Sequence, residues 1–189
     1  MAIHLPEAPP ETLEIVRRDA PALLNAAPGG KMRAMAEALP EVNVTHPHQV
    51  FSATIADVLA GLVLANARET TWRFFLVHRG DEPFAAAEVA GDALSHVNEG
   101  PFVDGTASAM IKAEQYAASN EHNYEMRLLR IPALYTLAVW LTAPGDDVLI
   151  PAAPAPAPLV ANEVYREESF TSALRPLAEI RNAADETSA

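Results

Sequence analysis

Most of the large apolar residues of this chain gather in two stretches, Thr71–Ala90 and Tyr124–Ile150. In the first stretch, successive side chains from Trp72 onward would point alternately to two different faces, as they do in a β-strand. Gly80-Asp81 marks a turn, and the segment Phe84–Ala90 returns with mostly alanine side chains. Because protein interiors contain few voids, we expect a helix to pack closely against this nearly bare strand.

The second stretch predicts three further strands, Glu125–Ile131, Leu134–Thr142 and Asp147–Ile150. A bend at Pro132 separates the first two, because proline cannot donate a hydrogen bond within a strand ladder. An alternative interpretation makes Pro132 the first residue of a helix, since 134–141 also shows helical spacing of its apolar residues. The Tyr, Thr, Val and Trp residues of this segment favour the strand.

Helical periodicity predicts most of the remaining elements. The clearest case is Val50–Ala67, where apolar residues recur every three or four positions and predict a central helix. Further helices are predicted at Lys31–Leu39, at Glu11–Asn25 as two short pieces divided by Pro21, at Thr106–Ser119 with Thr106 as its N-cap, and at Glu167–Asn182.

The chain is expected to form a loose arm over residues 1–10, a single globular domain over 11–184 and a tail over 185–189. Within that domain, 11–40 is a helical front segment, Gly91–Gly105 a polar connector, 151–160 an extended Pro/Ala segment, and 167–182 the C-terminal helix. The predicted fold class is α+β, with a mainly antiparallel sheet of about five strands packed against three or more helices.

The predicted order is helix, two strands, helix, three strands and helix. This order resembles that of small profilin-like or longin-like α+β modules, and the resemblance implies a sheet covered by helices. Fold alone does not imply function.

Composition narrows the classes of partner. The 13 Lys and Arg residues stand against 25 Asp and Glu residues, for a formal charge of −12. Such a chain lacks the basic surface that nucleic acids and anionic membranes require, so we expect neither as a partner. The chain has no cysteine, which excludes disulfides and thiolate sites. No basic segment followed by an apolar run opens the sequence, and we expect a cytoplasmic protein. The high content of alanine and proline suggests a GC-rich bacterial genome.

The histidines are the first candidates for chemistry, because imidazole titrates near neutral pH. His46 and His48 flank a proline, and His78 could pair with Glu88 on the facing strand of the first hairpin. These histidines could contribute to a metal site together with acidic residues. Two imidazoles at positions i and i+2 of an extended segment point to opposite faces, so structural roles are the preferred interpretation. Ser108, near a helix start, is interpreted as an ordinary first-turn residue.

Carboxylates and aromatic residues complete the candidates. Glu114 lies on the apolar face of its helix and would need a partner, with Arg127 or Arg130 available on the next strand; Glu125 shares a strand face with Arg127 and could pair with it. Trp72, Tyr135 and Trp140 are possible interface residues, because indole and phenol rings often anchor interfaces.

No nucleophile, metal or phosphate motif stands out, and no cofactor is predicted. We therefore expect a non-enzymatic protein-binding or assembly module, with a homodimer or another protein as partner. The alternatives are a small metal-dependent hydrolase or a small-ligand-binding domain using His46, His48 or His78, the ligand lying between Val50–Ala67 and the sheet.

Overall fold

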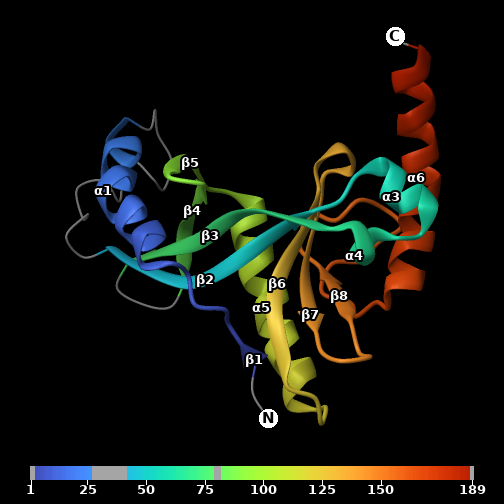
Figure 1. Cartoon of the computed structure of the whole chain (residues 1–189), viewed down its shortest axis with the longest axis horizontal. Helices are drawn as coiled ribbons and strands as arrows, with labels where there is room; N and C mark the ends of the chain where they lie inside the picture. Colours follow the sequence, from blue (N-terminus) through green and yellow to red (C-terminus); the bar gives the residue numbers. More distant parts are fainter. Residues whose placement is uncertain (1–2, 27–41, 79–81, 188–189) are drawn as a thin grey trace.

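The structure of the protein is a computed structural model that describes residues 3–26, 42–78 and 82–187. These residues form a mixed sheet of eight strands, five α-helices and one 3-10 turn (Figure 1). The strands are β1 (Ile3–His4), β2 (Val42–Ser52), β3 (Arg68–His78), β4 (Pro83–Ala90), β5 (Ala93–Asn98), β6 (Tyr124–Ile131), β7 (Thr136–Thr142) and β8 (Val148–Pro151). The helices are α1 (Pro10–Ala26), α3 (Ile55–Ala60), α4 (Val63–Asn66), α5 (Pro101–Ala118) and α6 (Glu167–Thr187), and the 3-10 turn is η2 (Pro132–Leu134).

The sheet has the strand order β5-β4-β3-β2-β6-β7-β8, and β1 pairs with β6 outside this path. Neighbouring strands are antiparallel except at two places, where β6 runs parallel to β2 and to β1. The α+β class is therefore confirmed. Most strand pairs are antiparallel, as expected, but the prediction of about five strands is not exact, because β1, β2 and β5 were not recognised as strands and the sheet is mixed.

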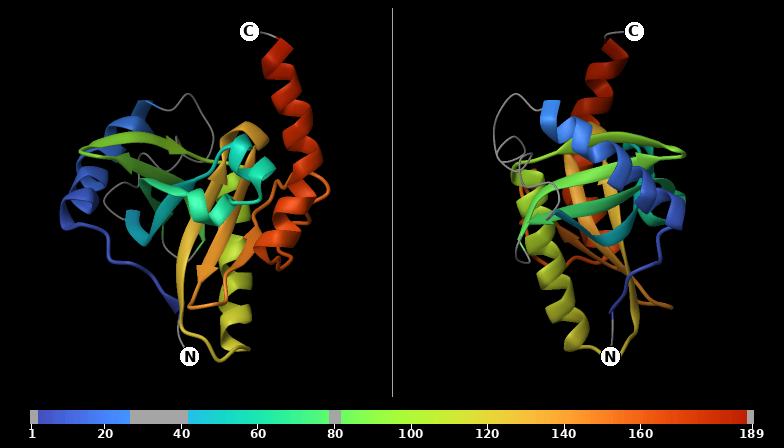
Figure 2. Two further views of the ribbon diagram at one scale, coloured as in Figure 1. Left: turned by 45° about the vertical axis from the view of Figure 1, so that its right-hand side comes forward. Right: turned by 90° about the vertical axis from the view of Figure 1, so that its left-hand side faces the viewer.

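Helices cover both faces of the sheet. Helix α5 packs on one face, where its small residues Ala109, Ala113 and Ala117 meet the buried side chains of the central strands. On the opposite face, α1 covers the end formed by β3 to β5, and α6 with α3 covers the end formed by β6 to β8. Figure 2 shows α1 and α5 on different sides of the sheet, and shows the C-terminal half of α6 projecting beyond the body.

Several predicted elements are confirmed. The hairpin of β3 and β4 and the order β6, η2, β7, β8 follow the predicted strands. A short 3-10 helix begins at Pro132 and ends at Leu134, and the segment from Thr136 is a strand and not an α-helix. The alanine strand β4 is closely packed, as expected: Ala86 lies in the cluster with α5, whereas Ala85 and Ala87 lie in the cluster with α1. The predicted turn Gly80-Asp81 and helix Lys31–Leu39 lie outside the described residues.

The predicted central helix Val50–Ala67 is wrong. Residues up to Ser52 continue strand β2, and helix α3 begins only after Thr54, which forms a capping box with Asp57. Gly61, at φ 73°, ends α3 in the left-handed conformation that glycine adopts without steric cost. A helical spacing of apolar residues therefore runs across a strand, a cap and two short helices.

Four other predictions are corrected. The connector Gly91–Gly105 contains strand β5 and the start of α5, because Pro101 occupies the first helical turn, where its missing N–H costs nothing. Thr106 is not an N-cap: it is buried inside α5, and its Oγ1 donates to the carbonyl of Phe102 at 2.5 Å. Pro21 lies within the single helix α1 and does not divide it, and residues 3–4 of the expected loose arm pair with β6.

Candidate functional site

A row of polar residues crosses the sheet on the face covered by α5. Arg73 on β3 is paired in register with Glu88 on β4, and Glu88 is paired with His96 on β5. Side chains of directly opposed residues project from the same face of a sheet. Arg73 and Phe75 therefore share a face, and the polar row continues the apolar core beneath α5.

Glu88 is the centre of this row. Its Oε1 accepts a hydrogen bond from Nη1 of Arg73 at 3.4 Å and a second, short one from Nη2 of Arg130. Its Oε2 accepts from Oγ1 of Thr71 at 3.3 Å, and Nε2 of His96 lies 3.7 Å from Oε1. Glu88 and Arg73 are buried, so this is an ion-pair network inside the protein and not a surface pair.

Arg130 joins the network from a distant strand. It lies on β6, which β3 and β2 separate from the β4 strand of Glu88 in the sheet order. The right-handed twist of strands rotates neighbours relative to one another and brings side chains of non-adjacent strands together over a concave face. The long guanidinium side chain spans the remaining gap.

The network fixes the charge of its members. Burial alone would raise the pKa of the Glu88 carboxyl, but the hydrogen bond and charge of Arg130, followed by the charges of Arg73 and His96, outweigh burial and hold the pKa below its usual value. Burial lowers the pKa of Arg73 to about 10, against the opposing effect of Glu88. At neutral pH, the carboxylate of Glu88 and the guanidinium of Arg73 are therefore both charged.

Arg73 has donor groups that the network does not use. Its Nη1 bonds to Glu88, whereas its buried Nε and Nη2 have no hydrogen-bond partner among the described residues. Nε and Nη2 lie on one edge of the planar guanidinium, and their N–H groups form a two-pronged donor suited to an anion. Unsatisfied donors on a buried cation are costly, and a native protein leaves them so only for a reason.

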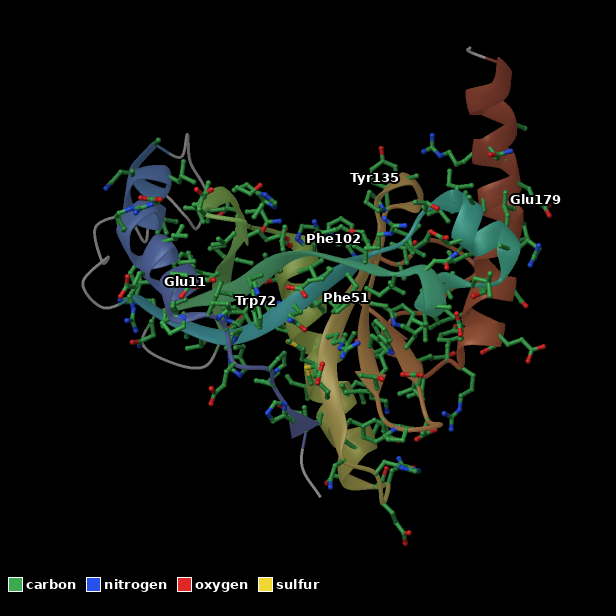
Figure 3. The ribbon with its side chains drawn as sticks, viewed as in Figure 1. Glu11, Phe51, Trp72, Phe102, Tyr135 and Glu179 are labelled. Atoms are coloured by element: carbon green, nitrogen blue, oxygen red, sulfur yellow. The ribbon has the colours of Figure 1, made fainter. Side chains whose placement is uncertain are left out.

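A cavity of about 260 Å³ is in contact with Arg73 and Arg130. Its other lining residues come from β5, α5, η2 and β7: His96, Asn98, Phe102, Pro132, Tyr135, Thr136 and Leu137. Figure 3 places Phe102 and Tyr135 at the upper side of the molecule, between the ends that carry α1 and α6. The cavity therefore combines two guanidinium groups with an apolar wall.

Tyr135 adds a conformational signal at this cavity. It follows η2 at φ 49° and ψ 35°, in the left-handed region that non-glycine residues rarely occupy. Its side chain is 68% exposed, and the guanidinium of Arg181 lies over its ring at 5.8 Å. Local strain of this kind is concentrated at functional sites, and here a large aromatic residue occupies a position that suits glycine.

The candidate histidines have different positions. His48 is fully buried opposite Arg73; Nδ1 lies 2.5 Å from the carbonyl oxygen of His46, and the ring packs against Phe75. Burial, followed by the charge of Arg73, lowers the pKa of His48 to about 3, so its ring is neutral. His78 is paired with Val42, far along β3 from the Arg73 position.

No metal centre emerges in the described part of the chain, where no three His, Asp or Glu side chains are grouped to hold an ion. The predicted pairing of His78 with Glu88 is wrong, because the register places Arg73 opposite Glu88. Ser108 is an exposed α5 residue whose hydroxyl accepts from Asn162 at 3.1 Å.

Of the other two predicted ion pairs, one is present in the structure and one is not. Glu125 and Arg127 do pair, with Nε of Arg127 2.6 Å from Oε1 of Glu125. Glu114 is exposed, and Arg130 pairs with Glu88, so the predicted partnership of Glu114 with Arg127 or Arg130 is wrong.

The three candidate interface aromatics do not lie together. Trp140 is buried in the cluster beneath α6, and its Nε1 donates to Asp147 at 2.9 Å. Trp72 packs against the cluster beneath α1 on the same face of the sheet. Only Tyr135 is largely exposed, and only Tyr135 lines the cavity.

A second polar cluster lies away from this cavity. Asp146, in the turn between β7 and β8, accepts hydrogen bonds from Tyr124 and Arg166, and His122 lies 3.8 Å from it. Burial opposes ionisation of Asp146, but these donors hold the pKa of its carboxyl below the usual value. The cluster ties three chain segments together, so we interpret it as structural.

A larger cavity of about 450 Å³ lies between α5 and the β2–β4 end of the sheet. Its lining residues include Phe75, Met110 and Ile111, together with the polar residues His46, Glu82 and Glu114. None of these lining residues has a buried polar atom without a partner in the described structure. The Arg73 cavity is therefore the stronger candidate for a site.

Sequence reasoning named Glu88 and Arg130 with other partners, and missed Arg73, His96 and the network that joins all four residues. The alternation of β3 placed Arg73 and Phe75 on one face, and a charged residue on the same face as a buried aromatic was the available signal. Glu88 was the one charge in the alanine strand. The contribution of Arg130 depends on sheet order and twist, for which the local pattern carries no signal.

The chain matches no protein-family model, no curated protein and no solved structure at a significant level. The resemblance to profilin-like or longin-like modules is therefore unsupported. In the described residues, no helix is both long and apolar enough to cross a membrane.

Proposed function

We propose that this chain is a non-enzymatic binding domain whose cavity at Arg73 holds a small anion. The observation that carries the proposal is that Arg73 is a buried cation beside a cavity, and that two of its buried donor groups have no partner among the described residues. An anion in the cavity would satisfy both donors at once. Its negative charge would also balance the positive charge that Arg73 and Arg130 carry in excess of the negative charge of Glu88.

Binding is favoured over catalysis because the cavity lacks an activated nucleophile among the described residues. The hydroxyl of Thr136 donates to the carbonyl of Leu134 at 3.1 Å and is committed to the turn. His96 lies 3.7 Å from the Glu88 carboxylate, beyond the distance at which a carboxylate orients a general base. The cavity thus offers charge and shape, but no base paired with a nucleophile.

Isothermal titration calorimetry with inorganic phosphate, sulfate and phenylacetate tests the proposal. We expect at least one of these anions to bind the wild type, and Arg73→Lys to weaken that binding at least tenfold, because lysine keeps the charge but loses the fork. Arg127→Lys, on the opposite face of the sheet, is the matched control. Absence of binding by all three anions, or equal binding by Arg73→Lys, contradicts the proposal.

Self-association is a second candidate function, and strand β5 favours it. β5 is the end strand of the described sheet and pairs only with β4, whereas β8 at the other end is extended by a bridge to Tyr165. An open strand edge can pair with a second chain. Light scattering across a dilution series tests this: we expect a dimer, and a monomer at every concentration would contradict it.

A further inference from the structure

Resting on the proposed anion site, we infer that its ligand is an organic monocarboxylate: one carboxylate held by Arg73, an apolar body, and a hydrogen-bond donor for Asn98. The geometry of Arg73 narrows the choice first. The Nε and Nη2 edge matches two oxygens in a plane, an arrangement found in both a carboxylate and a phosphate. The geometry of the guanidinium alone therefore allows two classes of ligand, carboxylates and phosphates.

The charge of the site favours the carboxylate. Arg73 and Arg130 contribute two positive charges and Glu88 one negative charge, which leaves one positive charge in excess among these three groups. A carboxylate neutralises this excess, whereas a phosphate monoester carries about −1.5 to −2 at pH 7 and would leave negative charge in a buried site. The net charge of −12 on the whole chain further disfavours a dianion.

The cavity wall favours an apolar body. Phe102, Pro132 and Leu137 line it from three different elements, and the ring of Tyr135 completes the rim. A hydrated inorganic ion would leave this wall in contact with water, whereas a hydrocarbon or aromatic body would bury it. The volume of about 260 Å³ suits a small molecule of this kind.

Asn98 supplies the third recognition element. It lines the same cavity from β5, and its Oδ1 is buried without a partner among the described residues. A buried acceptor needs a donor, because leaving it unsatisfied costs free energy. A hydroxyl or amino group on the ligand would supply that donor.

Ligands that differ from one another in one feature test the monocarboxylate inference separately from the anion site on which it rests. Phenylacetate, phenyl phosphate and 2-phenylethanol share one ring and differ in the head group, and acetate lacks the ring. By calorimetry we expect phenylacetate to bind at least tenfold more tightly than each of the other three. For the Asn98 element, 3-phenyllactate should bind more tightly than 3-phenylpropionate, which lacks the hydroxyl.

Each contrary result has a distinct meaning. Tighter binding of phenyl phosphate than phenylacetate, lost in Arg73→Lys, would overturn the carboxylate class but keep the anion site. Equal binding of acetate and phenylacetate would overturn the apolar body, and equal binding of the phenyllactate pair would overturn the donor for Asn98. No binding by any anion would remove the site itself.

A second variant protects the experiment against misfolding of Arg73→Lys. Asn98→Asp changes one half-buried side chain on the end strand β5 and preserves its shape. It places a negative charge on the cavity wall, so we expect it to weaken the binding of phenylacetate at least tenfold, and the binding of the neutral 2-phenylethanol by a smaller factor. Unchanged phenylacetate binding by this variant would contradict the assignment of the ligand to this cavity.

Discussion

Arg73 and Glu88 face each other across the β3–β4 hairpin with Nη1 3.4 Å from Oε1, and both side chains are almost fully excluded from solvent. A buried ion pair contributes little net stability compared with a well-packed apolar pair, because both charges lose their hydration. Removing one member is a different matter, since the other charge then stays buried without its partner. The pair therefore acts as a constraint on the sheet, and it also sets the charge of the cavity.

Glu88→Gln should strongly destabilise the fold. The variant leaves Arg73 and Arg130 close together with no carboxylate between them, and loss of one member of a buried pair costs about 3–5 kcal/mol. Urea unfolding measures the change in free energy. Glu125→Gln is the matched control, because its partner Arg127 is also an arginine, but the two side chains are 33% and 26% exposed; exposed pairs contribute about 0–1 kcal/mol. Equal losses in the two variants would contradict a special role for the buried network.

Stability should increase with pH from about pH 4.5 to about pH 6.5, because of His48. The folded-state pKa of His48 is about 3, below the ordinary value of 6.5. Between these values the unfolded chain binds one proton more than the folded chain, so acidification favours unfolding. One such proton corresponds to about 1.4 kcal/mol per pH unit. Below about pH 4.5, protonation of Glu88, whose folded-state pKa is lowered, should remove further stability in the same direction.

Urea unfolding at several pH values checks this prediction. His48→Gln should flatten the slope between about pH 4.5 and 6.5, because the buried titrating group is gone. His4→Gln, at an exposed position, is the control. A slope that is the same in wild type and His48→Gln would show that His48 does not carry the effect.

Gly105→Ala should destabilise the protein although it adds a better helix former. In an open helical position this exchange gains up to about 1 kcal/mol. At Gly105, an added Cβ would lie 1.8 Å from the backbone oxygen of Ala153, and backbone cannot move aside as a flexible side chain can. We expect a loss of at least ~2 kcal/mol from overpacking. Thermal and urea unfolding measure it, with Gln115→Ala on the exposed side of α5 as control; a stabilised Gly105→Ala would mean that α5 and the 151–159 segment are not in close contact.

The fold was predictable where the local sequence pattern fitted only one kind of secondary structure. A two-faced strand of bulky residues, followed by a turn and an alanine-rich return strand, identified β3 and β4, and β-branched and aromatic residues favoured β7 as a strand. The pattern failed at Phe51 and Ile55, which fit a helical stripe although they belong to a strand and to a separate helix. The stop signals were present, since Thr54 caps α3 and Gly61 ends it, but the periodicity outweighed them.

The candidate site was less predictable than the fold. Arg73 and Glu88 could be placed on neighbouring strands, but their pairing depends on the register of a hairpin whose turn was assigned only from Gly80-Asp81. Arg130 reaches them across two strands, and His96 lies on an edge strand too polar and short to show a clear period. Such juxtapositions come from sheet order and twist, which are properties of the whole chain.

Tyr135 provides the test of whether a strained residue serves the cavity. Tyr135→Gly and Tyr135→Ala remove the same ring and the same contact with Arg181, but only alanine keeps a Cβ at φ 49°. A side chain in the left-handed region costs roughly 1–2 kcal/mol. Glycine avoids this cost, but its greater freedom in the unfolded chain offsets part of the gain. We therefore expect Tyr135→Gly to be more stable than Tyr135→Ala by up to about 1 kcal/mol, the reverse of their usual order.

Binding should separate the two effects at this position. Both Tyr135 variants lose the aromatic rim of the cavity, so both should bind phenylacetate more weakly than the wild type, by similar factors. Tyr135→Phe keeps the ring and should bind as the wild type does. Urea unfolding and calorimetry on the three variants give both quantities. If Tyr135→Gly bound phenylacetate with wild-type affinity, the ring would have no part in recognition, and the left-handed backbone of Tyr135 would need a cause outside the cavity.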